Sequence, residues 1–312
     1  MGAVRKPKAA TSATDPSTEP SAKAASKPLS AGVGSPKSKN KPNSPEPNAS
    51  ASAREPFLGV LQSARGQMWV ERLDAQGHRS AETIAQRHGL PQLLGRVLAG
   101  RSITPDDVPV FLDPTIKALM PDPNVLIDMD RGAKRLADAI VAKTPIAIFG
   151  DYDVDGACAS ALLWRFLEAH GLNARIYIPD RLFEGYGPNA AAIEGLIKDG
   201  ARLIVTVDCG TTSFDALAAA KKHKVDVIVI DHHQADATLP DVHTVINPNR
   251  QDDLSKLGHL CAAGVVFMTL VATARELRTR GHYKDGQTQP NLLEDLDLVA
   301  LATVCDVVPL TT

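Results

Sequence analysis

IAIFGDYDVDG, residues 146–156, joins an apolar run to a cluster of acidic residues. The pattern recurs at residues 225–233, VDVIVIDHH, where the apolar run leads into Asp231, His232 and His233. Uninterrupted runs of this kind are typical of parallel strands that are buried on both faces of a sheet. Ligands of open α/β sheets bind beyond the carboxyl ends of such strands. The two stretches therefore predict a parallel sheet with acids and histidines along one edge.

Apolar runs and helical segments alternate from residue 144 to about residue 250. We expect strands at 146–149, 174–178, 203–207, 225–230 and 244–246, and helices at 157–169, 189–198 and 214–223. This alternation is typical of βαβ units with right-handed crossovers. Two further helices are predicted at 262–280 and 292–303. The predicted fold class is therefore α/β, with a mainly parallel five-stranded sheet flanked by helices.

The part of the chain before this region divides in two. Residues 1–55 are rich in Ala, Ser, Pro and Lys, so they cannot bury enough surface to offset the entropy lost on ordering. We expect a disordered tail there, either simply solvated or acting as a weak electrostatic tether to nucleic acid. Residues 56–143 show helical patterns, with amphipathic pieces at 81–90, 91–98 and 131–141. They predict a helical lead-in region ahead of a main domain at 144–312.

The composition limits the classes of function. The 34 basic and 36 acidic residues leave a net charge of -2, which excludes a strongly cationic nucleic-acid binder but allows a local basic groove. The 4 cysteines form no CxxC pair, and we expect them to be small buried residues in a reduced compartment. No long apolar run and no secretory signal are found, so a cytoplasmic location without membrane attachment is expected.

Three carboxylates, Asp151, Asp153 and Asp155, fall on alternate positions ahead of a predicted helix. Carboxylates this close repel one another unless cations neutralise them, and hard oxygen ligands favour Mg²⁺ or Mn²⁺. The alternative, an acidic loop that caps the helix, accounts for only one of them. The pattern therefore predicts metal binding.

Further acids and histidines follow other predicted elements. Asp208 comes directly after the strand at 203–207 and is either a helix cap or a carboxylate that bridges two metal ions. His232 and His233 are adjacent at a strand end beside an acid that can orient a ring, and imidazole shifts the preference toward Mn, Fe or Zn. Asp306 follows an apolar helix and would be unremarkable alone.

These residues carry a family resemblance. In order, the motifs Asp153-Val154-Asp155, Asp208, Asp231-His232-His233 and Asp306 resemble motifs one to four of the DHH phosphoesterase superfamily. The stretches at 149–156, 178–181, 184–189, 247–249 and 302–310 further resemble the RecJ-like single-strand-specific exonucleases of bacteria. The resemblance extends from about residue 90 to 310.

The resemblance implies a phosphodiesterase with two Mn²⁺ or Mg²⁺ ions that removes nucleotides from the 5′ end of single-stranded DNA in repair and recombination. By position it implies the following metal ligands: Asp153, Asp155, Asp208 as the bridge, His232 and Asp306, with Asp151 as a ligand or a support. His233 would be placed toward the scissile phosphate, either as a metal ligand or as a phosphate contact, and Asp231 would orient a histidine. Single-stranded DNA is the implied partner, with a helicase or a single-strand-binding protein joining the full-length enzyme.

Four residues are candidates for substrate contact. Arg181 suits a phosphate or a structural ion pair, and Tyr186 suits a base or sugar, since aromatic stacking contributes about 1–3 kcal/mol per base. Asn189 lies in the same segment, for which the alternative is a glycine-rich turn that Asn189 caps. His259 lies near a predicted helix start, where it either meets a phosphate or is plain structure.

The chain ends at Thr312, shortly after the fourth motif. RecJ-like proteins continue into a second catalytic-side domain and an oligonucleotide-binding domain, so we expect a truncated enzyme that cleaves DNA weakly. Two alternatives are a small-substrate member of the superfamily, acting on short oligonucleotides or cyclic dinucleotides, and a non-catalytic binding module. Residues 184–189 and the helical lead-in argue against the first. Retention of all the acids and histidines argues against the second.

Overall fold

The computed structural model describes residues 55–284 and 286–310. The predicted disordered tail therefore lies outside the described residues, apart from Glu55. The chain divides into two compact units, with the boundary after Glu71. In the first unit, a short 3-10 turn at Phe57–Gly59 (η1) accompanies an antiparallel bridge between Pro56 and Val70. The division predicted at residue 143 stays a prediction.

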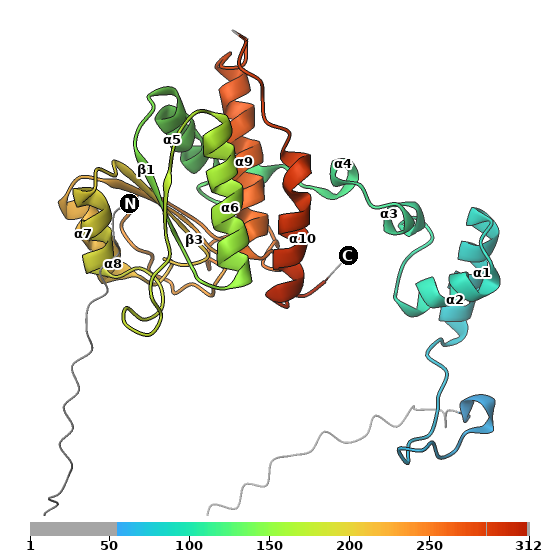
Figure 1. The fold of residues 1–312 in the computed structure, drawn as a ribbon. Coiled ribbons are helices and arrows are strands. Elements are labelled where there is room, and N and C mark those ends of the chain that lie inside the picture. Colours follow the sequence, from blue (N-terminus) through green and yellow to red (C-terminus); the bar gives the residue numbers. More distant parts are fainter. Residues whose placement is uncertain (1–54, 285, 311–312) are drawn as a thin grey trace, which may run out of the picture. The chain divides into compact units, whose positions relative to one another are not determined.

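The second unit is built on a five-stranded sheet in which every pair of neighbouring strands is parallel. The strands are β1 (Ile146–Gly150), β2 (Arg175–Tyr177), β3 (Leu203–Val207), β4 (Asp226–Ile230) and β5 (Thr244–Ile246). Their order is β2-β1-β3-β4-β5 (Figure 1). The predicted α/β class and sheet are confirmed, and the strand bounds shift only at their ends. β1 and β3 are neighbours although β2 lies between them in the sequence, so connections leave the two strands in opposite directions. Ligands of such sheets bind beyond the carboxyl ends of these strands.

Helices cover both faces of this sheet (Figure 1). α5 (Met129–Val141), α6 (Val154–Ala169) and α9 (Ala262–Thr279) share one hydrophobic core with the sheet, and α10 (Leu296–Cys305) packs against α6 and α9. α7 (Ala190–Lys198) and α8 (Phe214–Lys222) cover the opposite face. Alternate strand residues supply the two cores, as the pleat of a strand requires: Ile148 enters the first and Phe149 the second.

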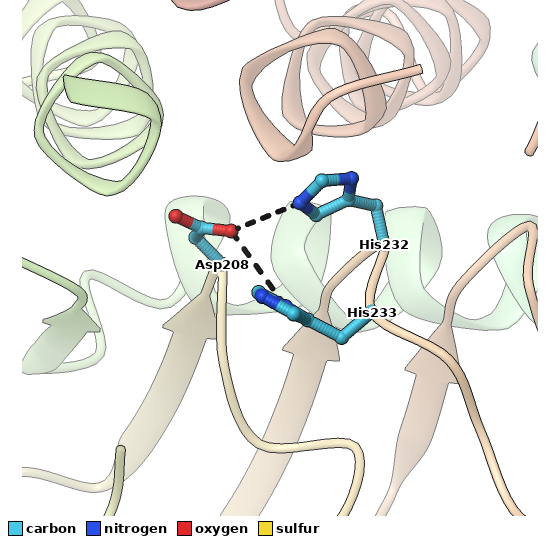
Figure 2. A group of neighbouring side chains, drawn as sticks. All are labelled: Asp208, His232 and His233. Carbon is cyan, nitrogen blue, oxygen red and sulfur yellow. Dashed lines mark ion pairs between the residues drawn. The ribbon is translucent and has the colours of Figure 1, made fainter. Parts of the chain in front are cut away.

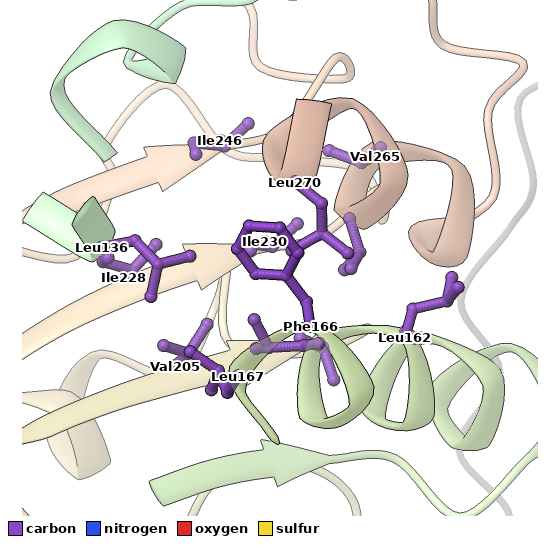
Figure 3. Packing of buried hydrophobic residues seen from close by; sticks show 14 of the residues in the cluster. Leu136, Leu162, Phe166, Leu167, Val205, Ile228, Ile230, Ile246, Val265 and Leu270 are labelled. Atoms are coloured by element: carbon purple, nitrogen blue, oxygen red, sulfur yellow. The ribbon is translucent and has the colours of Figure 1, made fainter. Parts of the chain in front are cut away.

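The larger core explains why the strands read as continuous apolar runs. Figure 3 shows Phe166 of α6 between Ile230 of β4 and Leu270 of α9, with Val205 of β3 and Leu136 of α5 nearby. Each of these side chains is at most 2% exposed. Burial of a large apolar side chain contributes about 1.5–3 kcal/mol relative to its exposed state. This core holds the strands, and therefore the residues at their ends, in one rigid frame.

Short helices precede the sheet in the second unit. They are α1 (Ala75–His88), α2 (Gln92–Gly100), α3 (Val108–Leu112), α4 (Ile116–Leu119) and the 3-10 turn η2 (Pro123–Val125). α1 begins at its cap Asp74, which accepts from the Gly77 N–H at 2.7 Å, and so starts before the expected residue 81. At Gly95 of α2 a Cβ would lie 2.4 Å from the Ala81 carbonyl oxygen, so only glycine allows α1 and α2 to approach so closely.

Three expectations need correction. α6 begins at Val154 and not at residue 157, because the Asp153 side chain caps it at the Gly156 N–H. The helix expected at 292–303 is a 3-10 turn at Leu292–Asp295 (η3) followed by α10. Of the four cysteines, three are buried as expected but Cys305 is exposed. Among the described residues, no helix combines the length and the apolar character that crossing a membrane requires.

Candidate metal centre

Three neighbouring strands deliver acids and histidines to the same edge of the sheet. Asp151 follows β1, Asp208 follows β3, and residues 231–233 follow β4. Because the strands are parallel, their carboxyl ends meet at one edge, where β1 and β3 are neighbours at the reversal of the strand order. The structure therefore brings together residues that are far apart in the sequence.

The three aspartates after β1 have different environments. Asp153 is exposed and caps α6, accepting from the Gly156 N–H at 2.9 Å. Asp155 is buried in the first turn of α6, and its two carboxylate oxygens accept from the Ala262 and Ala263 N–H groups at 2.6 and 2.8 Å. These amides form the amino end of α9, which favours a negative charge. Burial still raises the pKa of Asp155, although these two hydrogen bonds oppose the shift.

Asp151 is buried like Asp155, but one of its carboxylate oxygens is left without a partner. It is 3% exposed, and its Oδ1 atom has no hydrogen-bond partner. Burial, with the nearby charge of Asp153, raises the pKa of Asp151 to about 6. The backbones of Asp151 and Gly156 pack closely, because a Cβ at Gly156 would lie 2.6 Å from the Asp151 carbonyl oxygen.

Asp208 adopts an unusual backbone conformation directly after β3. Its φ is +61°, in the left-handed region, which aspartate tolerates better than most residues. Such conformations persist only where the surrounding structure enforces them, and they cluster at functional sites. The carboxylate is buried with its Oδ1 atom unpartnered, and burial together with the charges of Asp155 and Asp153 raises its pKa to about 7.

His232 lies at the centre of the acids. Its Nε2 atom is 3.3 Å from Asp208 Oδ1, 3.6 Å from Asp155 Oδ2 and 3.6 Å from Asp306 Oδ2. Figure 2 shows the Asp208 carboxylate facing this ring. The atom has no hydrogen-bond partner. Burial disfavours the charged ring, but the three carboxylates outweigh that effect and raise the pKa of His232. Asp306, at the end of α10, thus joins a site whose other members follow the strands.

His233 differs from His232 because both its ring nitrogens have partners within the protein. Nδ1 lies 2.8 Å from Asp231 Oδ1, and Nε2 lies 3.2 Å from the Tyr186 hydroxyl. The hydrogen bond to Asp231 raises the pKa of His233 to about 9, against the effect of its burial. Burial of Asp231 opposes ionisation, but His233 and the Thr211 N–H donor lower its pKa to about 2. The two residues therefore form an imidazolium–carboxylate pair at neutral pH.

Three groups of side chains place their ligand atoms within 4.8 Å of one another: Asp151, Asp153 and Asp208; Asp155, His232 and Asp306; and Asp208, His232 and His233. Buried polar atoms without partners are costly, and Asp151 Oδ1, Asp208 Oδ1 and His232 Nε2 are such atoms. Cations between them would satisfy all three. Carboxylates with one or two imidazoles suit Mn²⁺ or Mg²⁺, so the residues fit the expected ions. Asp208 and His232 each belong to two of the groups, and of the two only the carboxylate has a pair of oxygens with which to bridge two ions.

Of the four residues predicted to contact substrate, two lie beside the acids and histidines and two do not. The Arg181 guanidinium carbon lies 4.2 Å from the centre of the Tyr152 ring and 5.8 Å from that of Tyr186, and so forms a cation–aromatic stack beside Asp151. Tyr186 reaches the site through His233, as described above. Asn189 caps α7 at the Ala192 N–H and donates to Glu184, so its side chain already has partners. Among the described residues, His259 is half-buried in the turn before α9 and belongs to none of the three ligand groups.

Sequence reasoning missed several residues that support the site. Tyr152 stacks on Arg181, and the amino end of α9 holds Asp155. Thr211, Asn247 and Asn249 contact the residues that follow β4. The sequence does contain a signal for the two asparagines, which lie on either side of Pro248 directly after an apolar strand. Polar side chains at such a position are expected to have hydrogen-bond partners within the protein.

Fold and site together define an α/β protein with a candidate two-metal centre at the carboxyl ends of its parallel strands. Residues 145–303 match the model of the DHH family, N-terminal domain, and the chain belongs to this family. It is similar to the single-stranded-DNA-specific exonuclease RecJ of Salmonella typhimurium, with 38% identity over 231 residues, 73% of this chain and 39% of the relative. RecJ of Haemophilus influenzae is 38% identical over 204 residues, 64% of this chain and 34% of the relative.

Two solved structures agree with this family. An exonuclease RecJ bound to manganese has a TM-score of 0.51 and 34% identity, covering 59% of this chain and 44% of that chain. RecJ from Thermus thermophilus in complex with Mn²⁺ has a TM-score of 0.58 and 28% identity, covering 74% of this chain and 31% of that chain. The chain thus spans between 34% and 39% of the length of the two curated relatives named above.

Proposed function

We propose that this chain is the metal-binding catalytic part of an enzyme that hydrolyses phosphodiester bonds of single-stranded DNA, acting as an exonuclease from the 5′ end with two Mn²⁺ or Mg²⁺ ions. The observation that carries the proposal is the position of His232 Nε2, 3.3–3.6 Å from three carboxylates and without a hydrogen-bond partner. The substrate class is supported by the similarity to RecJ proteins over 64–73% of the chain.

The ligand groups suggest how two ions would be held. Asp155, His232 and Asp306 would hold one ion, and Asp151 and Asp153 would hold the other, with Asp208 shared between them. Two bound ions activate water and stabilise the charge that develops on a phosphodiester during in-line displacement. The role of Asp155 includes orientation, because the amino end of α9 fixes both its oxygens.

His233 suits a role at the phosphate better than a role as a ligand. Both nitrogens of the His233 ring already have partners within the protein, Asp231 at Nδ1 and the Tyr186 hydroxyl at Nε2, whereas Nε2 of His232 has no hydrogen-bond partner and is available to a metal ion. An imidazolium near the reacting centre stabilises negative charge on phosphate oxygens. Asp231 orients this ring, and the Arg181 stack adds a second cation beside the acids.

The biological setting extends the same proposal. The relatives are bacterial enzymes named for single-stranded DNA, which supports work on DNA in repair and recombination. A cytoplasmic location is part of the proposal. In the full-length enzyme we expect a helicase or a single-strand-binding protein to supply the single strand. Tyr186, half-exposed beside His233, is the candidate contact for a base or sugar. Asn189 and His259 remain predicted substrate contacts.

The test is digestion of single-stranded oligonucleotides carrying a label at either end, with Mn²⁺ or with EDTA, and with blunt duplex as the control substrate. We expect labelled mononucleotide from the 5′-labelled strand and a descending ladder from the 3′-labelled strand, in Mn²⁺ only. The matched variant Asp208→Asn keeps the volume of the side chain but removes the bridging charge, and should be inactive. Cleavage that persists in EDTA, or in Asp208→Asn with Mn²⁺, would refute the two-metal proposal.

A dinucleotide substrate separates the proposal from its alternative. Cleavage of the dinucleotide without cleavage of longer strands would indicate a small-substrate enzyme of the same family. Manganese binding without cleavage of either substrate would indicate a module that binds metal but is not catalytic in this form.

A further inference from the structure

We infer that the turn at residues 247–249, which follows β5, positions the two histidines of the metal centre, and that Asn247 and Asn249 are its positioning residues. The Asn247 side chain donates to the carbonyl oxygen of His233 at 2.9 Å, and the Asn249 side chain donates to the carbonyl oxygen of His232. Each asparagine therefore holds the backbone carbonyl of one histidine.

The turn is itself a closed hydrogen-bonded unit. Asn247 is fully buried, its second amide hydrogen goes to the Thr211 hydroxyl at 2.9 Å, and its Oδ1 atom accepts from the Asn249 N–H at 2.8 Å. Thr211 in turn donates its N–H to Asp231 Oδ2 at 3.0 Å. Asn247 thus connects β5, the loop after β3 and the loop after β4, with every polar atom of its side chain occupied.

A second anchor fixes the other end of the turn. Arg250 donates to the Val245 carbonyl at 2.7 Å and to Asp128 Oδ2 at 2.9 Å, and its side chain is only 9% exposed. On the opposite side, a Cβ at Gly258 would lie 2.4 Å from Asn249 Oδ1. The Asn249 side chain therefore lies between His232 in the loop after β4 and Gly258 in the segment that leads into α9, and a larger residue at position 258 would press on it.

The consequence concerns the direction of the imidazole rings. A histidine that binds metal needs its ring held in one orientation, and groups around the direct ligands commonly supply this. His232 Nε2 has no hydrogen-bond partner, so no bond at that atom sets its position. The Nδ1 atom of His233 is held by Asp231, but its backbone depends on Asn247. Loss of an asparagine donor would let the peptide groups after His232 or His233 rotate, and the rings would lose their fixed direction.

The test is the affinity of the purified chain for Mn²⁺, measured by electron paramagnetic resonance, for Asn249→Ala and for Gly258→Ala. Asn249→Ala removes the side chain that donates to the His232 carbonyl oxygen. Gly258→Ala leaves that side chain in place but adds a methyl group that pushes against it. We expect each variant to bind Mn²⁺ about 10- to 100-fold more weakly, the range typical for groups that support metal ligands. Asn291→Ala is the control: the Asn291 side chain also bonds the backbone, where it accepts from the Leu293 N–H, but it caps the 3-10 turn before α10, and the variant should bind Mn²⁺ normally.

Two further readouts separate positioning from general destabilisation. Affinity is measured well below the unfolding midpoint of each variant, with the folded fraction checked by near-ultraviolet circular dichroism. The activity arm rests on the proposed function: kcat at limiting Mn²⁺ should fall, KM for the oligonucleotide should stay unchanged, and excess Mn²⁺ should restore much of the rate. Unchanged Mn²⁺ affinity in folded Asn249→Ala and Gly258→Ala would overturn the inference. Absence of Mn²⁺ binding by the unmodified chain would instead overturn the proposed function, so the two failures are distinguishable.

Discussion

The Nε2 atom of His232 lies 3.3 Å from Oδ1 of Asp208, and neither atom has a hydrogen-bond partner. Both atoms are buried, and two further carboxylates approach the same nitrogen. An arrangement of unsatisfied polar atoms and repelling charges is unfavourable by itself. The stability of this edge of the sheet should therefore depend on bound cations, and that dependence can be measured.

Metal should stabilise the folded chain. At a free Mn²⁺ concentration of about a hundred times the Kd, binding to the native state alone adds about 2.7 kcal/mol to the free energy of unfolding. We expect the unfolding temperature to rise with Mn²⁺ and to fall to a common baseline in EDTA. Asp208→Asn should show a much smaller rise. An unfolding temperature that does not depend on Mn²⁺ would contradict the presence of the site.

The affinity for Mn²⁺ should increase with pH. The pKa of Asp151 is raised to about 6 and that of Asp208 to about 7, so protons compete with metal for these carboxylates near neutral pH. Raising the pH through this range removes the competing protons, and the affinity should level off well above pH 7. Titration calorimetry in two buffers of different ionisation enthalpy should detect proton release on binding near pH 6. No proton release there would contradict the raised pKa values.

The Asp231–His233 pair should control the alkaline limit of activity. The pKa of His233 is raised to about 9 because Asp231 stabilises the charged ring. A raised pKa means that this stabilisation is fully present below the ordinary histidine pKa and is lost as the pH rises through about 9. Asp231→Asn should lower the pKa of His233, move the alkaline limb of the pH–rate profile to lower pH, and reduce kcat by about 10²–10⁴-fold. An unchanged alkaline limb would show that His233 does not act in its charged form.

Substitution of Asp155 should lower the free energy of unfolding more than substitution of Asp153, although both residues are candidate ligands. Asp155→Ala leaves two buried N–H groups of α9 without acceptors, at about 1–3 kcal/mol each. Asp153→Ala removes an exposed helix cap, at about 1 kcal/mol. Urea unfolding in EDTA, where metal makes no contribution, should therefore show the larger loss for Asp155→Ala. Equal losses would contradict the structural role of Asp155 at the amino end of α9.

The sheet could be predicted closely from the sequence because both its faces are buried. Continuous apolar runs at residues 203–207 and 244–246 coincide with β3 and β5. Helix ends were less predictable, since a cap such as Asp153 depends on a side chain that can serve either a helix or a metal. The 3-10 turn before α10 has only 4 residues, LLED, which is too short for periodicity to separate it from the helix that follows.

The candidate ligands were also visible in the sequence, because acids and histidines directly after apolar strands have few structural explanations. The separate roles of these residues could not be predicted from the sequence. Asp155 accepts from amides 107 positions away, and His233 is held by a hydroxyl from Tyr186, 47 positions before it. Contacts of this range follow from packing and not from local pattern.

The sequence by itself determined the α/β class, the parallel strands and the identity of the acids and histidines at their ends. These follow from local apolar runs and from the chemistry of each side chain. Only the tertiary structure decided which carboxylates surround His232, that Asp208 takes a left-handed backbone conformation, and that Asn247 and Asn249 hold the two histidines. The physical reason is that each of these depends on distances between segments that only the order of the strands and the packing of the helices bring together.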